Sequence, residues 1–460
     1  MVHLTDFPFI DRFIPLAEGG ASSDNCFTVI LGKNGVGKSR LLAELVTNFS
    51  KPLLDKKSKY YVGRINSVPS KIIAVSTSPF DKFPTTRRDL NSSAAYSYIG
   101  MRASGVTTSN QMALILSAAK GLMTKYLETE QNENLAEIFD LLSLKPALSF
   151  IFKLNLKPKI EIKNPQGVQV KFSYDGMIPD FFNDESEFFK EILDEPTFQK
   201  YLEENHETRK KIRHALAVIW DQVEHQRGMF FKLNFDYLSK HRTGFVSKEI
   251  VSSLLTLLTH NIVKLYDLKI TKKTQLESFH EMSLRRASSG EQCLLVMILG
   301  IAGHISHNSL ILIDEPEISL HPSWQARFMD LIINIFKNYH ECHFIIATHS
   351  PQIVSRLSHG NCFITTMDDN ALHLASDFHQ RSADYQLTEL FDSPGMMNEY
   401  VSRMAFTLLT KVKAQKAILV VDTHMLARLN HIKASLELGD PNIDLINSVS
   451  EVCEYYASYN

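Results

Sequence analysis

Residues 32–39, GKNGVGKS, match a glycine-rich phosphate-binding loop in full. A short β-rich run, CFTVILG, leads into this loop, and a helical segment, KSRLLAELVTNF, follows it. In such a loop the backbone N–H groups surround phosphates at the positive end of a helix. Lys38 would reach the β- and γ-phosphates, and the Ser39 hydroxyl would ligate Mg²⁺. The segment therefore predicts binding of a nucleoside triphosphate.

Two further strand ends carry groups suited to hydrolysis. LILIDE, at 310–315, is an apolar strand that ends in Asp314 and Glu315. Asp314 can hold the metal through water, and Glu315 is placed to polarise an attacking water for in-line hydrolysis. His349 follows the next apolar strand and is a candidate sensor of the γ-phosphate. Taken singly, an acidic pair or a strand-end histidine can be purely structural, but the phosphate loop favours the chemical interpretation.

A small-residue stretch, RASSGEQ at 286–292, stands before a long apolar run. Ser288 or Ser289 ahead of Glu291 is typical of a helix start, where side-chain oxygens satisfy free N–H groups. A capped helix N-terminus is also an anion site. The stretch therefore has two compatible interpretations, a helix cap and a phosphate contact.

The strands that would position these groups are nearly continuous in apolar residues. They comprise 26–32, 71–78, 309–315 and 342–350, and a segment with helical periodicity, 322–339, lies between the last two. Apolar strands that alternate with helices are typical of a parallel sheet covered on both faces. We therefore expect an α/β fold with a largely parallel sheet.

The stretch from about 105 to 280 has a different pattern. It contains helical segments, a hairpin at 153–174 that turns at 164–167, and one charged helix from about 196 to 226. Such a helix would be about 45 Å long. Two series of residues recur in it every seven positions and form its seam, namely Phe198, Asn205, Ile212 and Ile219, and Leu202, Arg209, Leu216 and Val223. This pattern fits either a core-packed amphipathic helix or a protruding coiled-coil arm, and the polar seam residues Asn205 and Arg209 favour core packing.

Composition limits the possible classes of protein. A chain of 460 residues is expected to form two or three lobes. Its 49 basic and 51 acidic residues give a net charge of −2, so no global basic field indicates nucleic-acid binding, although a local patch remains open. Its five scattered cysteines argue against a zinc site and suit a reducing cytoplasm. We see no membrane-spanning run and no secretion signal.

The order of phosphate loop, serine-glycine signature, Asp-Glu strand and strand-end histidine resembles the ATP-binding-cassette (ABC) ATPases. Within them it is similar to the branch of SMC, RecF and OLD-type proteins, over about residues 1–100 and 281–375. The resemblance implies an ABC-type P-loop ATPase head that uses ATP and Mg²⁺. The implied residues are Asn34, Gly35, Gly37, Lys38, Ser39 and Arg40 for ATP, Ser39 and Asp314 for the metal, and Glu315 and His349 for catalysis.

The resemblance also implies a head-to-tail homodimer. In that arrangement Ser288, Ser289, Gly290 and Glu291 of one chain would meet the γ-phosphate held by the other, and EPEISLHP at 315–322 would run between the two sites. A higher assembly of such dimers stays open. The sequence departs from the family pattern after the strand at 71–78. No glutamine follows there, which leaves Ser78 or Asp81 as weak candidates for the metal-sensing residue.

Several members of the family fit less well. A transporter subunit would need membrane partners and a compact insert, and an SMC protein would need hundreds of heptad residues. An OLD-type nuclease would carry a metal-binding domain built on a glutamate and a D-x-D motif. The remainder of the chain after His349 offers only Asp422 in AILVVDTH. We therefore expect no nuclease activity in this chain.

Two further segments, YSYIGMR at 96–102 and 381–405, resemble PtuA-type ATPases, the ATPase subunits of Septu-type and retron-associated anti-phage systems. That resemblance implies a separately encoded HNH nuclease as partner, with nucleic acid as a further candidate partner and no membrane. A RecF-like DNA-repair or DNA-clamp ATPase without a nuclease partner is the alternative.

The expected regions follow from these assignments. They are an ATPase N-lobe at 1–104, a helical and hairpin insertion at 105–280, an ATPase C-lobe at 281–376, and a helical partner-binding region at 377–460. Within the last region, we expect two helices that break at Gly439 and Pro441.

Overall fold

The computed structural model shows a mixed α/β protein. It describes residues 3–19, 24–50, 68–84, 96–102, 111–128, 133–156, 162–163, 169–170, 185–224, 230–236, 246–273, 279–286, 289–357 and 360–458.

The chain forms two compact units. Met1–Tyr96 and Ser306–Asn460 make up the first unit, and Ser97–Ile305 makes up the second. The predicted insertion lies within the second unit, and the predicted C-terminal region lies within the first. The finer boundaries between the four expected regions stay a prediction.

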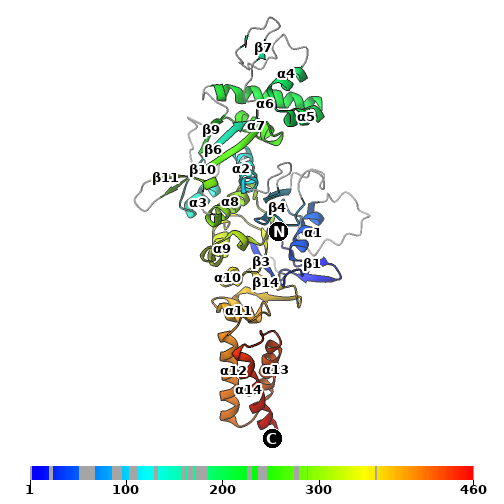
Figure 1. The fold of residues 1–460 in the computed structure, drawn as a ribbon, viewed down its shortest axis with the longest axis vertical. Helices are drawn as coiled ribbons and strands as arrows, with labels where there is room; N and C mark the ends of the chain where they lie inside the picture. Colours follow the sequence, from blue (N-terminus) through cyan, green and yellow to red (C-terminus); the bar gives the residue numbers. More distant parts are fainter. Residues whose placement is uncertain are drawn as a thin grey trace. The chain divides into compact units, whose positions relative to one another are not determined.

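A largely parallel sheet forms the centre of the first unit, as the sequence predicts (Figure 1). Its strands run in the order β15-β14-β3-β13-β12-β4, and β5, which extends into the second unit, follows β4. The pairs β14–β3, β3–β13, β13–β12 and β12–β4 are parallel, and β15 pairs antiparallel with β14. Every residue of the three middle strands β3, β13 and β12 is buried, because helices cover both faces of such a sheet. The bounds are β15 (Ala371–Leu374), β14 (Cys362–Thr366), β3 (Cys26–Leu31), β13 (His343–Ala347), β12 (Ser309–Asp314), β4 (Lys71–Ser76) and β5 (Tyr96–Gly100).

The parallel strands bring their carboxyl ends to one edge of the sheet. There β3 leads into the phosphate loop and α1 (Lys38–Ser50), and β12 leads into η2 (Pro316–Ser319) and α9 (Pro322–Ile335). The next strand, β13, leads into α10 (Pro351–Val354). This edge is where ligands bind in open α/β sheets. The remaining short elements of the unit are β1 (Asp6–Phe9), β2 (Arg12–Pro15), η3 (Ala375–Phe378) and α11 (Ala383–Glu389).

Three helices complete the first unit at the C-terminal end of the chain. They are α12 (Glu399–Gln415), α13 (Val420–Lys433) and α14 (Pro441–Ser458), and they enclose an apolar core of their own. Gly439 has a φ of 94°, a left-handed conformation that glycine adopts without strain. Pro441 then opens α14. The predicted break at these two residues is confirmed.

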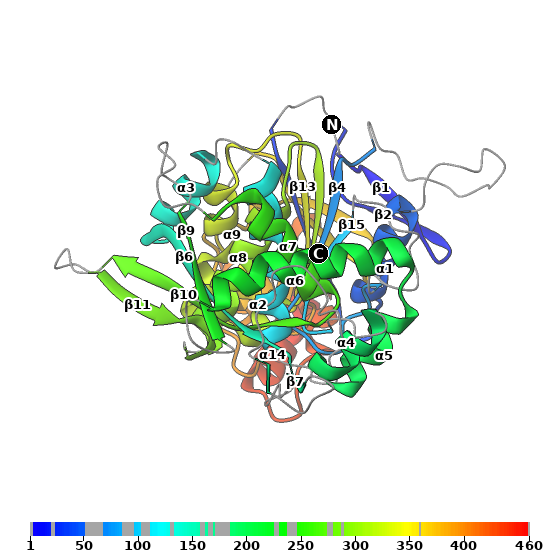
Figure 2. The ribbon, with the colours of Figure 1, turned by 90° about the horizontal axis from the view of Figure 1, so that it is seen from above.

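The second unit contains a four-stranded antiparallel sheet in the order β11-β10-β6-β9 (Figure 2). Helices α2, α3 and α7 pack on this sheet, and α2 also packs against α8. A Cβ added at Gly303 of α8 would lie 2.6 Å from the backbone of Gly121, so these two helices approach each other closely. The bounds are β11 (Phe279–Ser283), β10 (Val263–Lys273), β6 (Leu144–Leu154), β9 (Phe230–Asp236), α2 (Gln111–Glu128), α3 (Glu133–Leu141), α7 (Lys248–Thr259), η1 (Leu284–Arg286) and α8 (Ser289–His304).

The predicted hairpin is present as β7 (Ile162–Lys163) paired antiparallel with β8 (Gln169–Val170). Its predicted turn at 164–167 lies outside the described residues. Helix α4 (Glu185–Ile192) follows.

The prediction of a single charged helix over 196–226 is wrong, because two helices occupy this stretch. They are α5 (Glu195–Glu203) and α6 (His206–Glu224). Glu204 is extended, and the Asn205 side-chain oxygen accepts the Thr208 N–H at 2.8 Å. An asparagine side chain competes with the backbone in this way and starts a new helix. Seam residues Phe198, Ile212, Leu216 and Ile219 are buried, as core packing requires.

No helix among the described residues is both long and apolar enough to cross a membrane.

Candidate active site

The phosphate loop depends on glycine for its shape. It connects β3 to α1, and Gly35 and Gly37 have φ angles of 83° and 107°. These values lie in the left-handed region that side chains disfavour. A Cβ at Gly37 would also approach the Phe9 ring to 3.1 Å. Glycine is therefore required at this position by both conformation and space.

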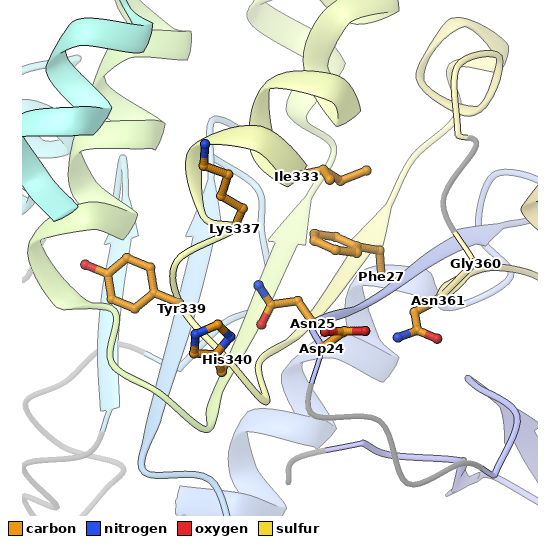
Figure 3. A pocket seen from close by; sticks show the side chains of 9 residues that line it. All are labelled: Asp24, Asn25, Phe27, Ile333, Lys337, Tyr339, His340, Gly360 and Asn361. Atoms are coloured by element: carbon orange, nitrogen blue, oxygen red, sulfur yellow. The ribbon is translucent and has the colours of Figure 1, made fainter.

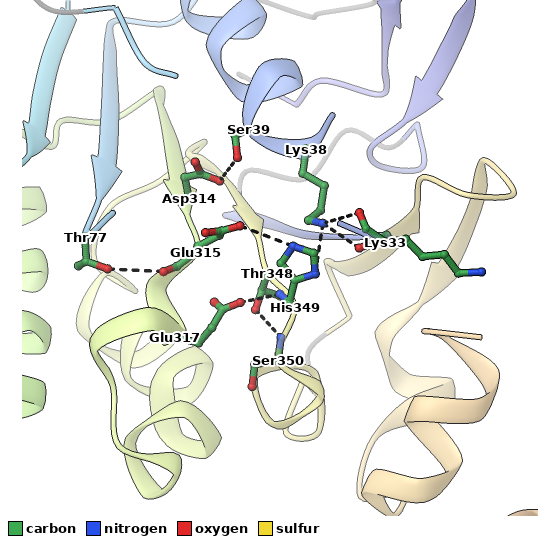
Figure 4. Close-up of polar contacts among 11 residues, drawn as sticks. Lys33, Lys38, Ser39, Thr77, Asp314, Glu315, Glu317, Thr348, His349 and Ser350 are labelled. Carbon is green, nitrogen blue, oxygen red and sulfur yellow. Dashed lines mark hydrogen bonds and ion pairs between the residues drawn. The ribbon is translucent and has the colours of Figure 1, made fainter. Parts of the chain in front are cut away.

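Lys38 stands at the base of this loop and is only 5% exposed. Its ammonium donates to the Gly32 carbonyl at 2.7 Å and lies 3.4 Å from Nδ1 of His349 (Figure 4). Burial lowers the pKa of Lys38, and the nearby Glu315 carboxylate opposes that shift. The loop carbonyl and the histidine together hold a cation at the first turn of α1.

Ser39 and Asp314 form the second polar pair. The Ser39 hydroxyl donates to Oδ1 of Asp314 at 3.1 Å. Asp314 is 2% exposed, and burial raises its pKa to about 7, with smaller contributions from the carboxylates of Glu315, Asp81 and Glu317. Several carboxylates beside a hydroxyl are the oxygen ligands that Mg²⁺ prefers. A divalent cation would offset the repulsion among them, so these residues fit a magnesium site.

Glu315 follows Asp314 in a left-handed conformation, with φ 48° and ψ 57°. Its N–H donates to the Ala347 carbonyl at 2.9 Å, and this bond fixes the conformation against the end of β13. Left-handed backbone at a non-glycine residue costs about 1–3 kcal/mol and is concentrated at functional sites. It turns the Glu315 side chain toward His349, where Oε1 lies 3.5 Å from Nε2.

His349 lies between Lys38 and Glu315. Burial and the Lys38 charge lower its pKa to about 4, so the ring is neutral near pH 7. Nδ1 faces the Lys38 ammonium and must accept, which assigns the ring proton to Nε2, on the Glu315 side. One neutral histidine thus links the loop lysine to the strand-end glutamate.

The sequence did not single out Glu317, which the structure places in the same cluster. Its Oε1 accepts the backbone N–H of His349 at 2.5 Å, and burial raises its pKa. Ser350 is held in turn, since its hydroxyl donates to Oε1 of Gln325 on α9 at 2.7 Å. The only signal in the sequence is a second carboxylate two residues after Glu315. Its contact with His349 depends on tertiary structure.

Two of the residues proposed for ATP lie at the exposed rim of the loop. Asn34 is exposed, and Arg40 pairs with Glu44 at 2.9 Å while its guanidinium lies 5.8 Å from the centre of the Phe9 ring. The structure shows no closer engagement for either residue within the described part of the chain.

The two candidates for the metal-sensing residue, Ser78 and Asp81, are both buried. The charge of Asp81 contributes to the raised pKa of Asp314, which places its carboxylate near the magnesium ligands. The Ser78 hydroxyl accepts the backbone N–H of Phe80 at 3.2 Å instead. Asp81 is therefore the better candidate of the two.

The serine-glycine signature belongs to the second unit. Ser288 lies outside the described residues, while α8 begins at Ser289 and Gly290, so a helix starts where the sequence predicts one, and its capping by serine stays a prediction. Glu291, in the first turn, pairs with Lys272 of β10 at 2.6 Å. Lys38, Ser39, Asp314, Glu315 and His349 are thus brought together in one unit, and the signature is presented by the other.

A separate cavity of about 360 Å³ lies at the opposite edge of the parallel sheet, where β3 and β14 begin (Figure 3). Its lining combines charged, amide and aromatic side chains, namely Asp24, Asn25, Phe27, Ile333, Lys337, Tyr339, His340 and Asn361, together with Gly360. It shares no residue with the Lys38 cluster.

Comparison with known proteins identifies similar sequences. A family model described as "AAA domain, putative AbiEii toxin, Type IV TA system" matches residues 158–355, which include the signature, Asp314, Glu315 and His349. The phosphate loop lies upstream of the match and completes the set of motifs. Together with the largely parallel central sheet, this match is consistent with the fold of a P-loop ATPase.

The chain is similar to two proteins named as probable ATPases of retrons. It is 23% identical over 365 residues to "Retron Vc95 probable ATPase" of Vibrio cholerae serotype O1 biovar El Tor, which covers 73% of this chain and 68% of the relative. It is 28% identical over 189 residues to "Retron Ec83 probable ATPase" of Escherichia coli, which covers 37% of this chain and 32% of that relative. The chain thus spans about a third of the second relative and about two thirds of the first.

Proposed function

We propose that the chain is the ATP-hydrolysing subunit of an anti-phage defence complex, that it dimerises head to tail around ATP, and that it gates a separate HNH-type nuclease. The observation that carries the ATPase part is the convergence of Lys38, the Ser39–Asp314 pair and the Glu315–His349 pair at the carboxyl edge of one parallel sheet. The similarity to ATPases of retrons supports the defence context.

Each residue of the cluster has a role that its surroundings favour. The Lys38 ammonium and the loop N–H groups would bind the β- and γ-phosphates. Ser39 and Asp314 would hold Mg²⁺, which when bound neutralises phosphate charge and orients the terminal phosphoryl group. Because Asp314 is buried among carboxylates, its affinity for a proton is high, and a cation at this position would keep it ionised.

Glu315 is the proposed general base. Its left-handed backbone aims the carboxylate at the space beside His349, where it can orient an attacking water and accept its proton. The neutral His349 ring faces Lys38 with Nδ1 at 3.4 Å and Glu315 with Nε2 at 3.5 Å, so it can report the γ-phosphate to the base through these two polar contacts.

The dimer proposal is supported by the position of the signature. Ser289 and Gly290 start α8, and a helix start is a phosphate-binding element. In the proposed dimer this helix start, with Ser288, meets the γ-phosphate bound to Lys38 of the partner chain. The Lys272–Glu291 ion pair would hold the first turn of α8 against β10.

The C-terminal helices are the proposed binding region for the nuclease partner. Leu419, Val420 and Val421 expose between 50% and 74% of their surface at the start of α13, and Phe406 of α12 exposes 53%. Contiguous exposed apolar surface often marks protein interaction sites, and three of these residues are consecutive in the sequence.

The matched pair of wild type and Glu315→Gln tests the ATPase proposal. The amide cannot accept the proton of water, so the variant should bind ATP normally, release almost no phosphate and accumulate as a closed dimer. Phosphate release and size-exclusion chromatography with ATP measure both effects. Wild-type turnover in the variant would remove Glu315 from the mechanism.

The partner proposal has its own test. The chain is purified together with the products of its neighbouring genes, and the co-eluting proteins and nucleic acids are identified. We expect an HNH protein to co-elute. Tight ATP-dependent DNA binding without any nuclease would instead favour a RecF-like clamp.

A further inference from the structure

The antiparallel sheet of the second unit has one covered face and one exposed face. Along β9, Phe231, Leu233 and Phe235 are buried, while the alternating residues, including Phe230 and Lys232, are exposed. This is the period of a strand with one face on a core. The buried residues contact helices such as α2, whose Tyr126 ring lies 5.2 Å from Phe235. We call the opposite side the outer face. Its charged and aromatic residues include Lys153, Phe230, Lys232, Asp236, Lys264, Tyr266, Lys269 and Glu281, with Arg285 at its edge, and Asp267 lies buried on the same side, where it accepts the Ser283 hydroxyl.

The outer face carries an excess of cations. The register pairs Lys153 of β6 with Lys264 of β10, so two lysines lie directly opposite each other, and the Lys264 ammonium donates to Oδ1 of Asn155 at 3.2 Å. Glu281 neutralises part of the charge, since it bonds Lys232 at 3.1 Å and Lys269 at 2.9 Å. Within the described residues, no ion pair neutralises Lys153, Lys264 or Arg285. Like charges directly opposite each other are unfavourable on a sheet, so this arrangement favours an anionic ligand.

Two aromatic side chains lie among these cations. Phe230 is 44% exposed and Tyr266 is 45% exposed, and their ring centres are 4.9 Å apart. The Lys153 ammonium lies 5.6 Å from the Phe230 ring, and the Arg285 guanidinium lies 5.0 Å from the Tyr266 ring. Aromatic groups and cations therefore alternate across neighbouring strands.

A bulge in β10 accounts for the position of Tyr266. The register between β10 and β6 shifts between Leu265 and Asp267, which leaves Tyr266 without a partner opposite it. Bulges re-aim side chains and are typical of functional surfaces. Here the bulge presents Tyr266 beside Phe230 rather than in the core, where a large aromatic would gain more burial.

We propose that the outer face binds single-stranded nucleic acid. Lys153, Lys264 and Arg285 contact its phosphates, and unpaired bases stack on Phe230 and Tyr266. Cations that follow a backbone, interleaved with aromatic rings on which bases stack, are the two components of single-strand recognition. A duplex offers phosphates but keeps its bases stacked on each other, and an acidic peptide offers charge without flat rings. The face shares no residue with the proposed ATP site, so the inference goes beyond ATP hydrolysis.

Fluorescence anisotropy of a labelled oligothymidylate of about 16 nucleotides, the upper range for one binding face, tests the stacking. The full-length protein is used, with the variant Phe230→Ala/Tyr266→Ala. Stacking contributes roughly 5- to 150-fold per base, so we expect the affinity to fall at least about tenfold. Tyr455→Ala removes a ring of α14 that is 56% exposed, and this control should bind as the wild type does.

The charge variants Lys153→Glu and Lys264→Glu provide an independent readout. Each lost phosphate contact should flatten the slope of log affinity against log salt by about 0.7. Lys210→Glu changes the same charge on the exposed side of α6 and should leave the slope unchanged. Circular dichroism melting curves verify that each variant is folded.

Competition experiments distinguish between the possible ligands of the outer face. Unlabelled oligothymidylate should displace the probe, whereas a duplex of the same length and a polyglutamate peptide should compete at least about tenfold less well. The proposal is overturned if the aromatic double variant and both lysine variants bind the probe like the wild type. It is equally overturned if the duplex or the peptide competes as well as the single strand.

Discussion

Glu317→Ala tests how the His349 backbone is held in place. The Glu317 carboxylate accepts the His349 N–H at 2.5 Å and also a hydrogen bond from the Thr348 side chain. A hydrogen bond to a charged group contributes about 1.5–3 kcal/mol. If that contribution serves to keep His349 between Lys38 and Glu315, its loss lowers kcat by roughly 10- to 150-fold, at about 1.4 kcal/mol for each factor of ten.

The assay separates hydrolysis from binding. Phosphate release under saturating ATP gives kcat, and calorimetry gives the Kd for ATP. We expect the Kd to change less than kcat, since Lys38 and the loop make no contact with Glu317 among the hydrogen bonds described. Glu317→Gln keeps an acceptor oxygen but places an amide where Oε2 is buried without a partner, so its kcat should be intermediate. Glu454→Ala, on the exposed side of α14, is the matched control.

Two outcomes would refute this reasoning. Wild-type kcat in Glu317→Ala would show that the contact does not position His349. A Kd for ATP that rises as much as kcat falls would show a general loss of structure at the site. Thermal melting of each variant, measured in parallel, reports the stability that the unpaired N–H costs.

Two further predictions concern Lys38 and the core histidine His343. Lys38→Ala should abolish ATP binding, because it removes the cation at the base of the phosphate loop, and undiminished affinity in calorimetry would contradict the loop assignment. Burial lowers the pKa of His343 to about 3, and its ring is bonded to the Leu4 N–H and the Thr28 hydroxyl. Below its unfolded pKa of about 6.5 only the unfolded chain takes up this proton, so the free energy of unfolding should fall as pH decreases, by up to about 1.4 kcal/mol per pH unit. Asp314 has the opposite effect: its pKa is raised in the folded protein, so it makes the free energy of unfolding rise as pH decreases. The comparison of urea unfolding between wild type and His343→Gln therefore isolates the histidine, and equal slopes against pH would contradict its neutral burial.

The local part of the architecture could be predicted from sequence. Strands β3, β12 and β13 are short apolar runs bounded by polar or glycine residues, and each ends in a residue with a chemical task. Parallel strands align their carboxyl ends, so the residues that end or follow β3, β12 and β13, among them Lys38, Asp314 and His349, lie at one edge of the sheet. The structure brings these three side chains into a single cluster there.

The nonlocal part could not be predicted. Nothing near Glu317 indicates that its carboxylate meets the backbone of His349, because η2 and β13 are joined only through tertiary structure. The break at Asn205 was missed because heptad spacing continues across it, and the side-chain cap overrides that spacing. The antiparallel sheet pairs strands from distant segments, and the exposure of Tyr266 depends on a one-residue shift in register.

The head-to-tail composite site is tested most directly by complementation. Phosphate release is measured for wild type, for Ser288→Arg, for Lys38→Ala and for a re-equilibrated mixture of the two variants. Ser288→Arg should still bind ATP, because Lys38 belongs to the other unit, but it should not hydrolyse ATP. In the mixed dimer both lesions fall in one site and the opposite site is intact, so the mixture should regain part of the wild-type activity. Normal ATP hydrolysis by Ser288→Arg as a monomer would contradict the account.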